Sequence, residues 1–189
     1  MLYLLYIYVR EILGRNVTRL VTSELIVAVA VGFLYGYGVL TADLVGHNVP
    51  VARFTEQVLA LAGIGLGACL TAVTMAVRLS DADFADYLAT EVPSASVNFD
   101  AVLFKLSWTA VVNWATLILS TGVLLLSPGS ASLFDPHLAA GWKIIIALQL
   151  ALLVYGVMLL FATVLTISVL GIQRWRWRES RQYGRAGDE

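Results

Sequence analysis

Five polar residues that could do chemistry recur along the third apolar stretch of the chain. They are spaced three or four residues apart: Lys105, Thr109, Asn113, Thr116 and Ser120. On a helix this spacing places all five side chains on one face. A second, weaker row on the fourth apolar stretch comprises Gln149, Gly156, Thr163 and Thr166. Polar side chains in lipid turn toward a neighbouring helix or a water-filled cavity. The rows therefore predict either interhelical hydrogen bonds, which we favour, or the lining of a pore.

The two histidines raise the question of a metal site. Asp43 and His47 are four residues apart, and Asp135 and His137 are two apart. These four side chains could hold a metal ion if the loops that carry them met. Asp and His are also ordinary turn residues at membrane surfaces, so we expect no metal. The single Cys69 excludes an intrachain disulfide and a cysteine-based zinc site.

Enzyme signatures are missing from the sequence. It contains no zinc-protease motif, phosphate-binding loop or nucleophile elbow. The middles of the apolar stretches contain no Asp, Glu, Arg or His, one of which a proton-coupled transporter would normally need. We therefore expect a protein with no enzymatic activity and no cofactor.

Composition indicates which elements must position the polar rows. Hydrophobic residues make up 59% of the 189-residue chain, charged residues make up 13%, and the mean hydropathy is +0.82. Soluble domains carry about a quarter charged residues, so these charges could not cover a soluble surface. The net charge of −1 gives no sign of a nucleic-acid partner. We predict an all-α integral membrane protein, because lipid requires every backbone polar group to be paired internally.

Four stretches are long and apolar enough to cross a bilayer, which takes about 20 helical residues. They comprise residues 21–40, 57–77, 102–126 and 142–170. The connections between them contain the Pro, Gly, Asp and Asn residues of turns. The sequence therefore predicts a single domain over residues 1–189 with four transmembrane helices.

The positive charges are distributed unequally along the chain. Ten of the twelve Lys and Arg residues lie in the N-terminal arm, in the basic tail 171–189, or beside the connection 79–100. Only Arg53 and Lys143 lie beside the other two connections. The positive-inside rule therefore places both termini in the cytoplasm, with the chain in the plasma (inner) membrane.

Residues 1–18 begin with an apolar run that does not resemble a signal peptide. They lack a basic first region and a small-residue cleavage site. Leu2, Leu5 and Val9 would share one helix face, and Tyr and Arg residues would lie on the others. This pattern predicts a helix lying in the membrane interface. The alternative is that these residues extend the first span into the cytoplasm.

Aromatic and basic residues near the span ends are typical of a lipid interface. At the outer end of the first span they are Tyr35 and Tyr37. In the tail they are Arg174, Trp175, Arg176, Trp177 and Arg178. Interleaved Trp and Arg could also stack on single-stranded nucleic acid. Their position directly after a span favours lipid headgroups, so we expect a lipid partner and no nucleic acid.

Two rows of small residues predict close helix contacts. They are Ala28, Gly32 and Gly36 on the first span, and Gly63, Gly67 and Thr71 on the second. Small residues four apart allow close backbone approach, so these rows predict packing of the two spans or self-association. The first row overlaps the stretch "GFLYGYG", whose last three residues match a potassium-channel filter. A filter needs a re-entrant segment, whereas this stretch ends an uninterrupted span.

Glu24 is the one acidic residue inside a predicted span. It lies about one turn from the cytoplasmic end, near the expected depth of Arg78 and Lys105. An unpaired charge at this depth is costly. We therefore predict an ion pair with one of these two residues, and a gating or ion-binding role is the alternative.

The predicted cytoplasmic connection is acidic on an otherwise basic side of the membrane. Its acidic residues include Asp81, Asp83, Asp86 and Glu91. They could be neutralised by the arginines of the terminal arms, could dock a cytosolic protein with a basic surface, or could simply be solvated.

The sequence as a whole favours a non-enzymatic membrane subunit that forms homo-oligomers and presents its cytoplasmic face to a soluble protein partner. Such a scaffold, anchor or sensor component would fit a respiratory, secretion or anti-phage defence complex. The alternative is a homo-oligomeric ion channel or pore lined by the polar face of residues 102–126.

Overall fold

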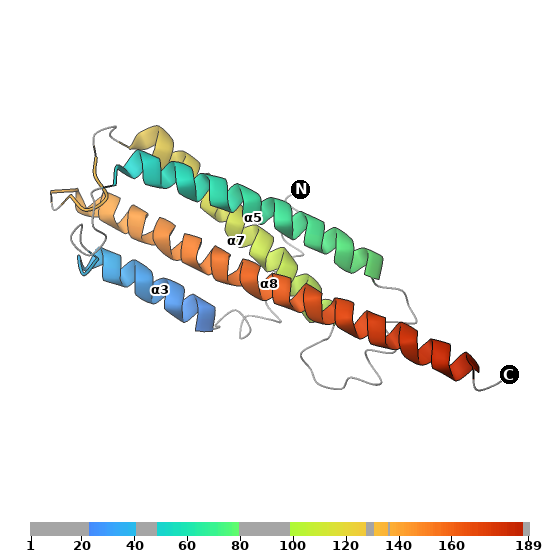
Figure 1. The fold of residues 1–189 in the computed structure, drawn as a ribbon. Coiled ribbons are helices and arrows are strands. Elements are labelled where there is room, and N and C mark those ends of the chain that lie inside the picture. The colour runs from blue at the N-terminus through green and yellow to red at the C-terminus, as the bar shows by residue number, and fades with distance from the viewer. Residues whose placement is uncertain (1–22, 41–48, 80–98, 128–130, 136, 187–189) are drawn as a thin grey trace. The chain divides into compact units, whose positions relative to one another are not determined.

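The computed structural model describes residues 23–40, 49–79, 99–127, 131–135 and 137–186. This part of the chain has no β-strand and forms four helices (Figure 1): α3 (Ser23–Gly36), α5 (Val51–Leu79), α7 (Phe99–Leu126) and α8 (Ala140–Ala186). The predicted all-helical fold is confirmed for these residues. The predicted interfacial helix and most of the 79–100 connection lie outside them.

Three of the four helices are long and apolar enough to cross a membrane. Their candidate spans are Val51–Ala76, Val102–Leu126 and Ala140–Glu179. Helix α3 is also apolar but has only 14 residues within the described chain. At 1.5 Å per residue it is about 21 Å long, which is shorter than the hydrocarbon core of about 30 Å.

Helix α3 ends at Gly36, earlier than the predicted boundary at residue 40. Gly38 has a φ of +74°, the left-handed conformation that glycine adopts without a steric penalty. Its N–H donates to the Tyr35 carbonyl at 2.9 Å, and the Val39 N–H donates to the Leu34 carbonyl at 3.0 Å. These two bonds form a Schellman cap. The second Gly of Gly-Tyr-Gly thus ends the helix.

Helix α5 begins six residues before the predicted start at residue 57. Pro50 lies directly before its first residue, and the Pro50 carbonyl accepts the Phe54 N–H at 3.1 Å. Proline has no N–H to satisfy and has a φ suited to a helix start. The polar side chains of Arg53 and Glu56 therefore lie on the first turns of α5. Because these residues are charged, hydropathy predicts a boundary after them.

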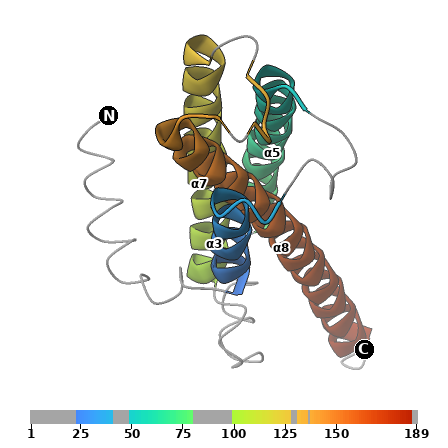
Figure 2. The ribbon, with the colours of Figure 1, turned by 90° about the vertical axis from the view of Figure 1, so that its left-hand side faces the viewer.

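Helix α8 continues beyond the predicted end at residue 170. It has 47 residues, which at 1.5 Å per residue gives about 70 Å. Most of the predicted basic tail is therefore a continuation of the helix, as the single ribbon of α8 shows in Figures 1 and 2. Arg, Gln and Glu are good helix formers, so the loss of hydropathy after Leu170 does not end the helix.

The chain forms two compact units. Unit 1 comprises Met1–Ile64 and Val112–Met158, and unit 2 comprises Gly65–Val111 and Leu159–Glu189. Helices α5, α7 and α8 each contribute one part to each unit.

The core of unit 1 contains residues from all four described helices and from the segments before α5 and before α8. Its buried residues are Tyr35, Val51, Val123, Leu133 and Ile146. Pro50 and Ser132 form an isolated antiparallel bridge. The Val51 N–H donates to the Ala131 carbonyl at 3.0 Å, and the Leu133 N–H donates to the Val49 carbonyl at 2.9 Å. These backbone bonds fix the 131–135 segment to the start of α5.

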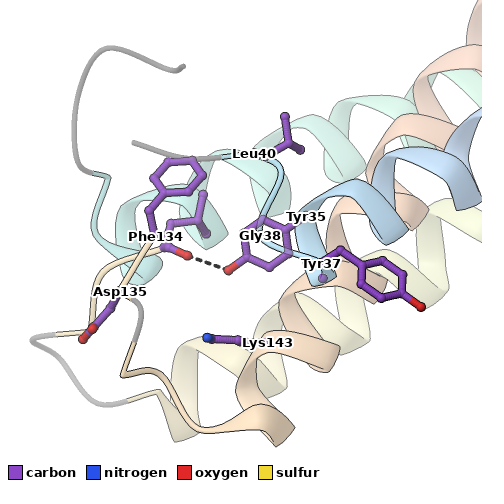
Figure 3. A pocket seen from close by; sticks show the side chains of 9 residues that line it. Tyr35, Tyr37, Gly38, Leu40, Phe134, Asp135 and Lys143 are labelled. Atoms are coloured by element: carbon purple, nitrogen blue, oxygen red, sulfur yellow. Dashed lines mark hydrogen bonds between the residues drawn. The ribbon is translucent and has the colours of Figure 1, made fainter. Parts of the chain in front are cut away.

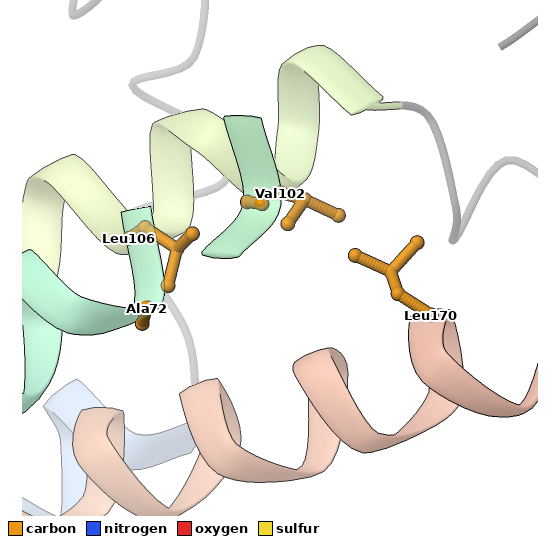
Figure 4. Packing of buried hydrophobic residues seen from close by; sticks show 5 residues of the cluster. Ala72, Val102, Leu106 and Leu170 are labelled. Carbon is orange, nitrogen blue, oxygen red and sulfur yellow. The ribbon is translucent and has the colours of Figure 1, made fainter. Parts of the chain in front are cut away.

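The core of unit 2 consists of small and aliphatic residues from α5, α7 and α8. Its buried cluster consists of Ala72, Ala76, Val102, Leu106 and Leu170, and Figure 4 labels four of them. Trp177, on the helical continuation of α8, packs against the same cluster.

Candidate functional site

The part of the α7 polar row that lies in unit 1 is buried. Asn113, Thr116 and Ser120 are 3%, 2% and 0% exposed, and Gln149 on α8 is 0% exposed. The Gln149 Nε2 donates a hydrogen bond to the Ser120 Oγ at 3.0 Å. The polar rows of α7 and α8 thus meet in a direct interhelical contact.

Asn113 lies against a glycine of α8. A Cβ built at Gly156 would lie 3.4 Å from the Asn113 Oδ1, which is at the close end of ordinary contact. The missing side chain at this position leaves room for the Asn113 amide. Gly156 therefore belongs to the polar contact by making space for it.

Thr116 satisfies its hydroxyl within its own helix. The Oγ1 donates to the Val112 carbonyl at 2.8 Å, a bond that threonine commonly makes to the preceding turn. Because the hydroxyl proton of Thr116 is used in this bond, it is not available to a solute in the described arrangement.

Among the described residues of unit 1, two buried polar atoms have no hydrogen-bond partner: the Gln149 Oε1 and the Thr55 Oγ1. Thr55 is fully buried on α5 and was not among the predicted site residues. It shares a buried row with Val51, Val58 and Ala62, and this spacing of four, three and four was the signal that could have placed it inside.

The polar row continues in unit 2 with Thr109, which is 0% exposed. Its Oγ1 lies 3.3 Å from the Oγ1 of Thr163 on α8, and it donates to the Lys105 carbonyl at 2.7 Å. Lys105 itself is half-buried. In unit 2, as in unit 1, the polar row of α7 thus contacts α8, here through Thr109.

Four exposed hydroxyl groups on α5, α7 and α8 bond to their own backbones. Each donates to the carbonyl four residues earlier at 2.8–3.0 Å: Thr71, Thr74, Thr121 and Ser168. Such a hydroxyl presents little unsatisfied polarity to lipid or to a neighbouring chain.

The two rows of small residues have different surroundings. On α3, Ala28 and Gly32 are buried, and a Cβ at Gly32 would come within 3.0 Å of the Ala147 carbonyl oxygen on α8. On α5, Gly63, Gly67 and Thr71 are exposed. A Cβ built at Gly36, Gly63 or Gly67 would meet nothing within 4 Å. The α3 row thus contacts α8 through Gly32, and whether the α5 row self-associates stays a prediction.

Tyr35 is buried within the protein, whereas the sequence predicts it at the lipid interface. It is only 7% exposed, and its hydroxyl donates to the Leu133 carbonyl at 2.6 Å (Figure 3). The expectation was wrong because the 131–135 segment covers this side of α3. Tyr37 is 80% exposed, and its lipid contact stays a prediction.

The tail residues divide between protein contacts and exposed positions. The Arg174 Nη1 donates to the Arg78 carbonyl in the last turn of α5 at 3.2 Å, and a cation is favourable at a helix C-terminus. Trp177 packs on the core of unit 2. Trp175, Arg176 and Arg178 are exposed, as lipid-facing residues would be.

The other charged candidates remain predictions. Glu24 lies in the first turn of α3 and accepts a hydrogen bond from the Ser23 hydroxyl at 3.3 Å. Its predicted partners, Arg78 and Lys105, belong to the other unit. The acidic residues proposed for docking lie outside the described residues: Asp81, Asp83, Asp86 and Glu91.

The two connections that carry the candidate metal ligands meet through Pro50 and Ser132, but Asp43 and His47 lie outside the described residues. The His137 N–H donates to the Asp135 Oδ1 at 2.8 Å, as in an ordinary turn. Within the described chain, no three His, Cys, Asp or Glu side chains are grouped so as to hold a metal ion.

No protein-family model matches the chain, and comparisons with curated proteins and with solved structures find no match either.

Proposed function

We propose that the chain is a non-enzymatic membrane subunit that self-associates and presents its cytoplasmic face to a soluble protein. The observation that supports this most is the contrast between two kinds of surface. Four of the five polar-row residues of α7 are buried, and Thr109 and Ser120 contact α8, whereas the glycine row of α5 is exposed. Interhelical contacts in lipid depend on close packing at small residues. The α5 row is therefore the surface best suited to a second copy.

The length of α8 supports a role outside the bilayer. A helix of about 70 Å is longer than a complete bilayer of about 40–45 Å. One end of α8 would therefore extend beyond the lipid. The C-terminal end carries the arginines that the positive-inside rule assigns to the cytoplasm. With the acidic residues of the 79–100 connection, this end offers a partner both signs of charge.

The runner-up function is a homo-oligomeric pore. It would require Asn113, Thr116 and Gln149 to line a water-filled path. In the described units these residues face another helix of the same chain, and exposed hydroxyls bond to their own backbones. Both observations favour a packing role.

Reconstitution into liposomes distinguishes the two functions. We expect no ion flux above that of empty liposomes, and Asn113→Leu should leave this result unchanged. Flux that appears with the purified chain and is altered by Asn113→Leu would favour the pore.

The docking surface has its own test. A soluble protein that co-purifies with the chain should be identified by mass spectrometry and rebound in purified form. We expect its binding to be lost when Asp81, Asp83 and Asp86 are replaced by Lys, because charge complementarity would be reversed. A matched control replaces Arg53 by Glu on the opposite side. Equal loss in both variants would argue against a cytoplasmic docking site.

A further inference from the structure

An open, apolar groove lies between α3 and α8 in unit 1. Its volume is about 490 Å³, and its walls include Val29, Phe33, Ile144 and Leu148. These four side chains are 42–68% exposed. Ligand pockets commonly enclose about 300–1,000 Å³, so the groove could accept a long apolar chain.

A second cavity adjoins this groove at the C-terminal end of α3 (Figure 3). Its volume is about 280 Å³, and Gly36, Tyr37 and Lys143 line both spaces. Asp135 lines only the second cavity. In Figure 3 the Lys143 side chain points from α8 toward the segment that carries Asp135. An apolar compartment thus joins one that contains both an ammonium and a carboxylate group.

We infer that this joined site binds one zwitterionic phospholipid whose headgroup ends in a primary ammonium, as in phosphatidylethanolamine. An acyl chain would lie along the groove, with the lipid phosphate near the Lys143 ammonium and the lipid ammonium near the Asp135 carboxylate. The pair of opposite charges matches a zwitterionic headgroup better than an anionic one. The inference depends on the proposed location of the chain in a membrane, and it adds a specific lipid to that proposal.

Gly36 occupies the junction of the two spaces. A Cβ at this position would meet nothing within 4 Å, and Gly36 has no positive φ that would disfavour a side chain. A leucine at position 36 would therefore fill the junction without strain in the backbone. Gly171 on α8 offers a matched control, because it is an exposed helical glycine whose Cβ would also meet nothing within 4 Å.

Native mass spectrometry of the full-length chain, exchanged into detergent with equal amounts of phosphatidylethanolamine and phosphatidylglycerol, tests the inference. The wild-type chain should retain one phosphatidylethanolamine in preference to phosphatidylglycerol. Gly36→Leu should lose the lipid and Gly171→Leu should keep it. Lys143→Gln should weaken retention of both lipids about fivefold, the loss expected for one lysine near a phosphate. Asp135→Asn should remove the preference for phosphatidylethanolamine. Circular dichroism and size exclusion confirm the fold of each variant.

Three results would overturn the inference: no retained lipid, equal retention by all variants, or a preference for phosphatidylglycerol. If Gly36→Leu changes the proportion of dimer instead of lipid, a second copy occupies the groove. If lipid binds only after residues 1–18 are deleted, the N-terminal segment occupies the groove.

Alkaline extraction of membranes separates this inference from the proposed function. A chain that stays in the membrane but retains no lipid contradicts the inference alone, whereas a chain released into solution contradicts both.

Discussion

The Gln149 amide on α8 donates a hydrogen bond to the Ser120 hydroxyl oxygen on α7 at 3.0 Å, and both residues are fully buried. We expect Ser120→Ala to destabilise the folded chain by about 1 kcal/mol, because the buried amide loses its acceptor. Reversible unfolding in detergent measures this free energy. Thr121→Ala is the control, since Thr121 is exposed and bonds to its own helix.

A double-mutant cycle with Gln149→Leu separates the bond from the other effects of each substitution. We expect a coupling energy of about 0.6 kcal/mol, the average for polar contacts between membrane helices. Strict additivity of the two substitutions would show that the bond contributes nothing to stability.

Gly32 lies close against α8. A Cβ there would lie 3.0 Å from the Ala147 carbonyl oxygen and 3.1 Å from the Ala151 Cβ. We expect Gly32→Ala to cost about 1–3 kcal/mol through overpacking. Gly36→Ala, one turn later, should be neutral or should stabilise α3 by about 0.5–1 kcal/mol. The same unfolding measurement compares them, and equal effects would mean that the helices are not in close contact at Gly32.

The Tyr35 hydroxyl fixes α3 to the 131–135 segment through its bond to the Leu133 carbonyl. We expect Tyr35→Phe to cost about 0.5–1.5 kcal/mol and to speed hydrogen exchange at the Leu133 amide. Tyr37→Phe should change neither quantity, because Tyr37 is 80% exposed. Unchanged exchange at Leu133 in Tyr35→Phe would contradict this role.

Arg174 donates to a carbonyl at the C-terminal end of α5. We expect Arg174→Gln to lower the unfolding free energy by about 0.3–1 kcal/mol, since it removes a cation from the negative end of the helix dipole. Arg176→Gln changes the same charge at an exposed position and should have no measurable effect. If the two substitutions prove equivalent in unfolding experiments, Arg174 acts only through the net charge of α8.

Hydropathy and periodicity predicted the helical fold, four membrane spans, and the polar rows of α7 and α8. Three of the four described helices are long and apolar enough to cross a membrane, and α3 is shorter. These features follow from local residue type, because lipid and helix geometry constrain them directly. The ends of the helices were harder to predict. Gly38 stops α3 by adopting a positive φ, and α8 continues past Leu170 because its arginines favour a helix.

Tyr35 shows why the remaining features could not be predicted. A tyrosine at the end of an apolar helix is typical of a lipid interface. Here its hydrogen-bond partner, Leu133, is 98 residues away in sequence. Only the tertiary arrangement of the 131–135 segment brings them together, and no local pattern reports that contact. The burial of Thr55 was recoverable from its spacing, but the lack of a partner for its hydroxyl was not.

Self-association through the exposed row of α5 is the central claim, and cysteine crosslinking in native membranes tests it most directly. Cys69 is buried and is first replaced by Ala. Single cysteines are then introduced as Gly63→Cys, Gly67→Cys and Thr71→Cys. Two exposed positions on other helices, Ile118→Cys on α7 and Phe161→Cys on α8, serve as controls.

A disulfide needs Cα atoms within about 4.4–6.8 Å, so mild oxidation reports only close helix pairs. We predict covalent dimers at the three α5 positions, strongest at position 67, and little or none at positions 118 and 161. No dimer at any α5 position, or equal dimer formation at the control positions, would contradict the claim.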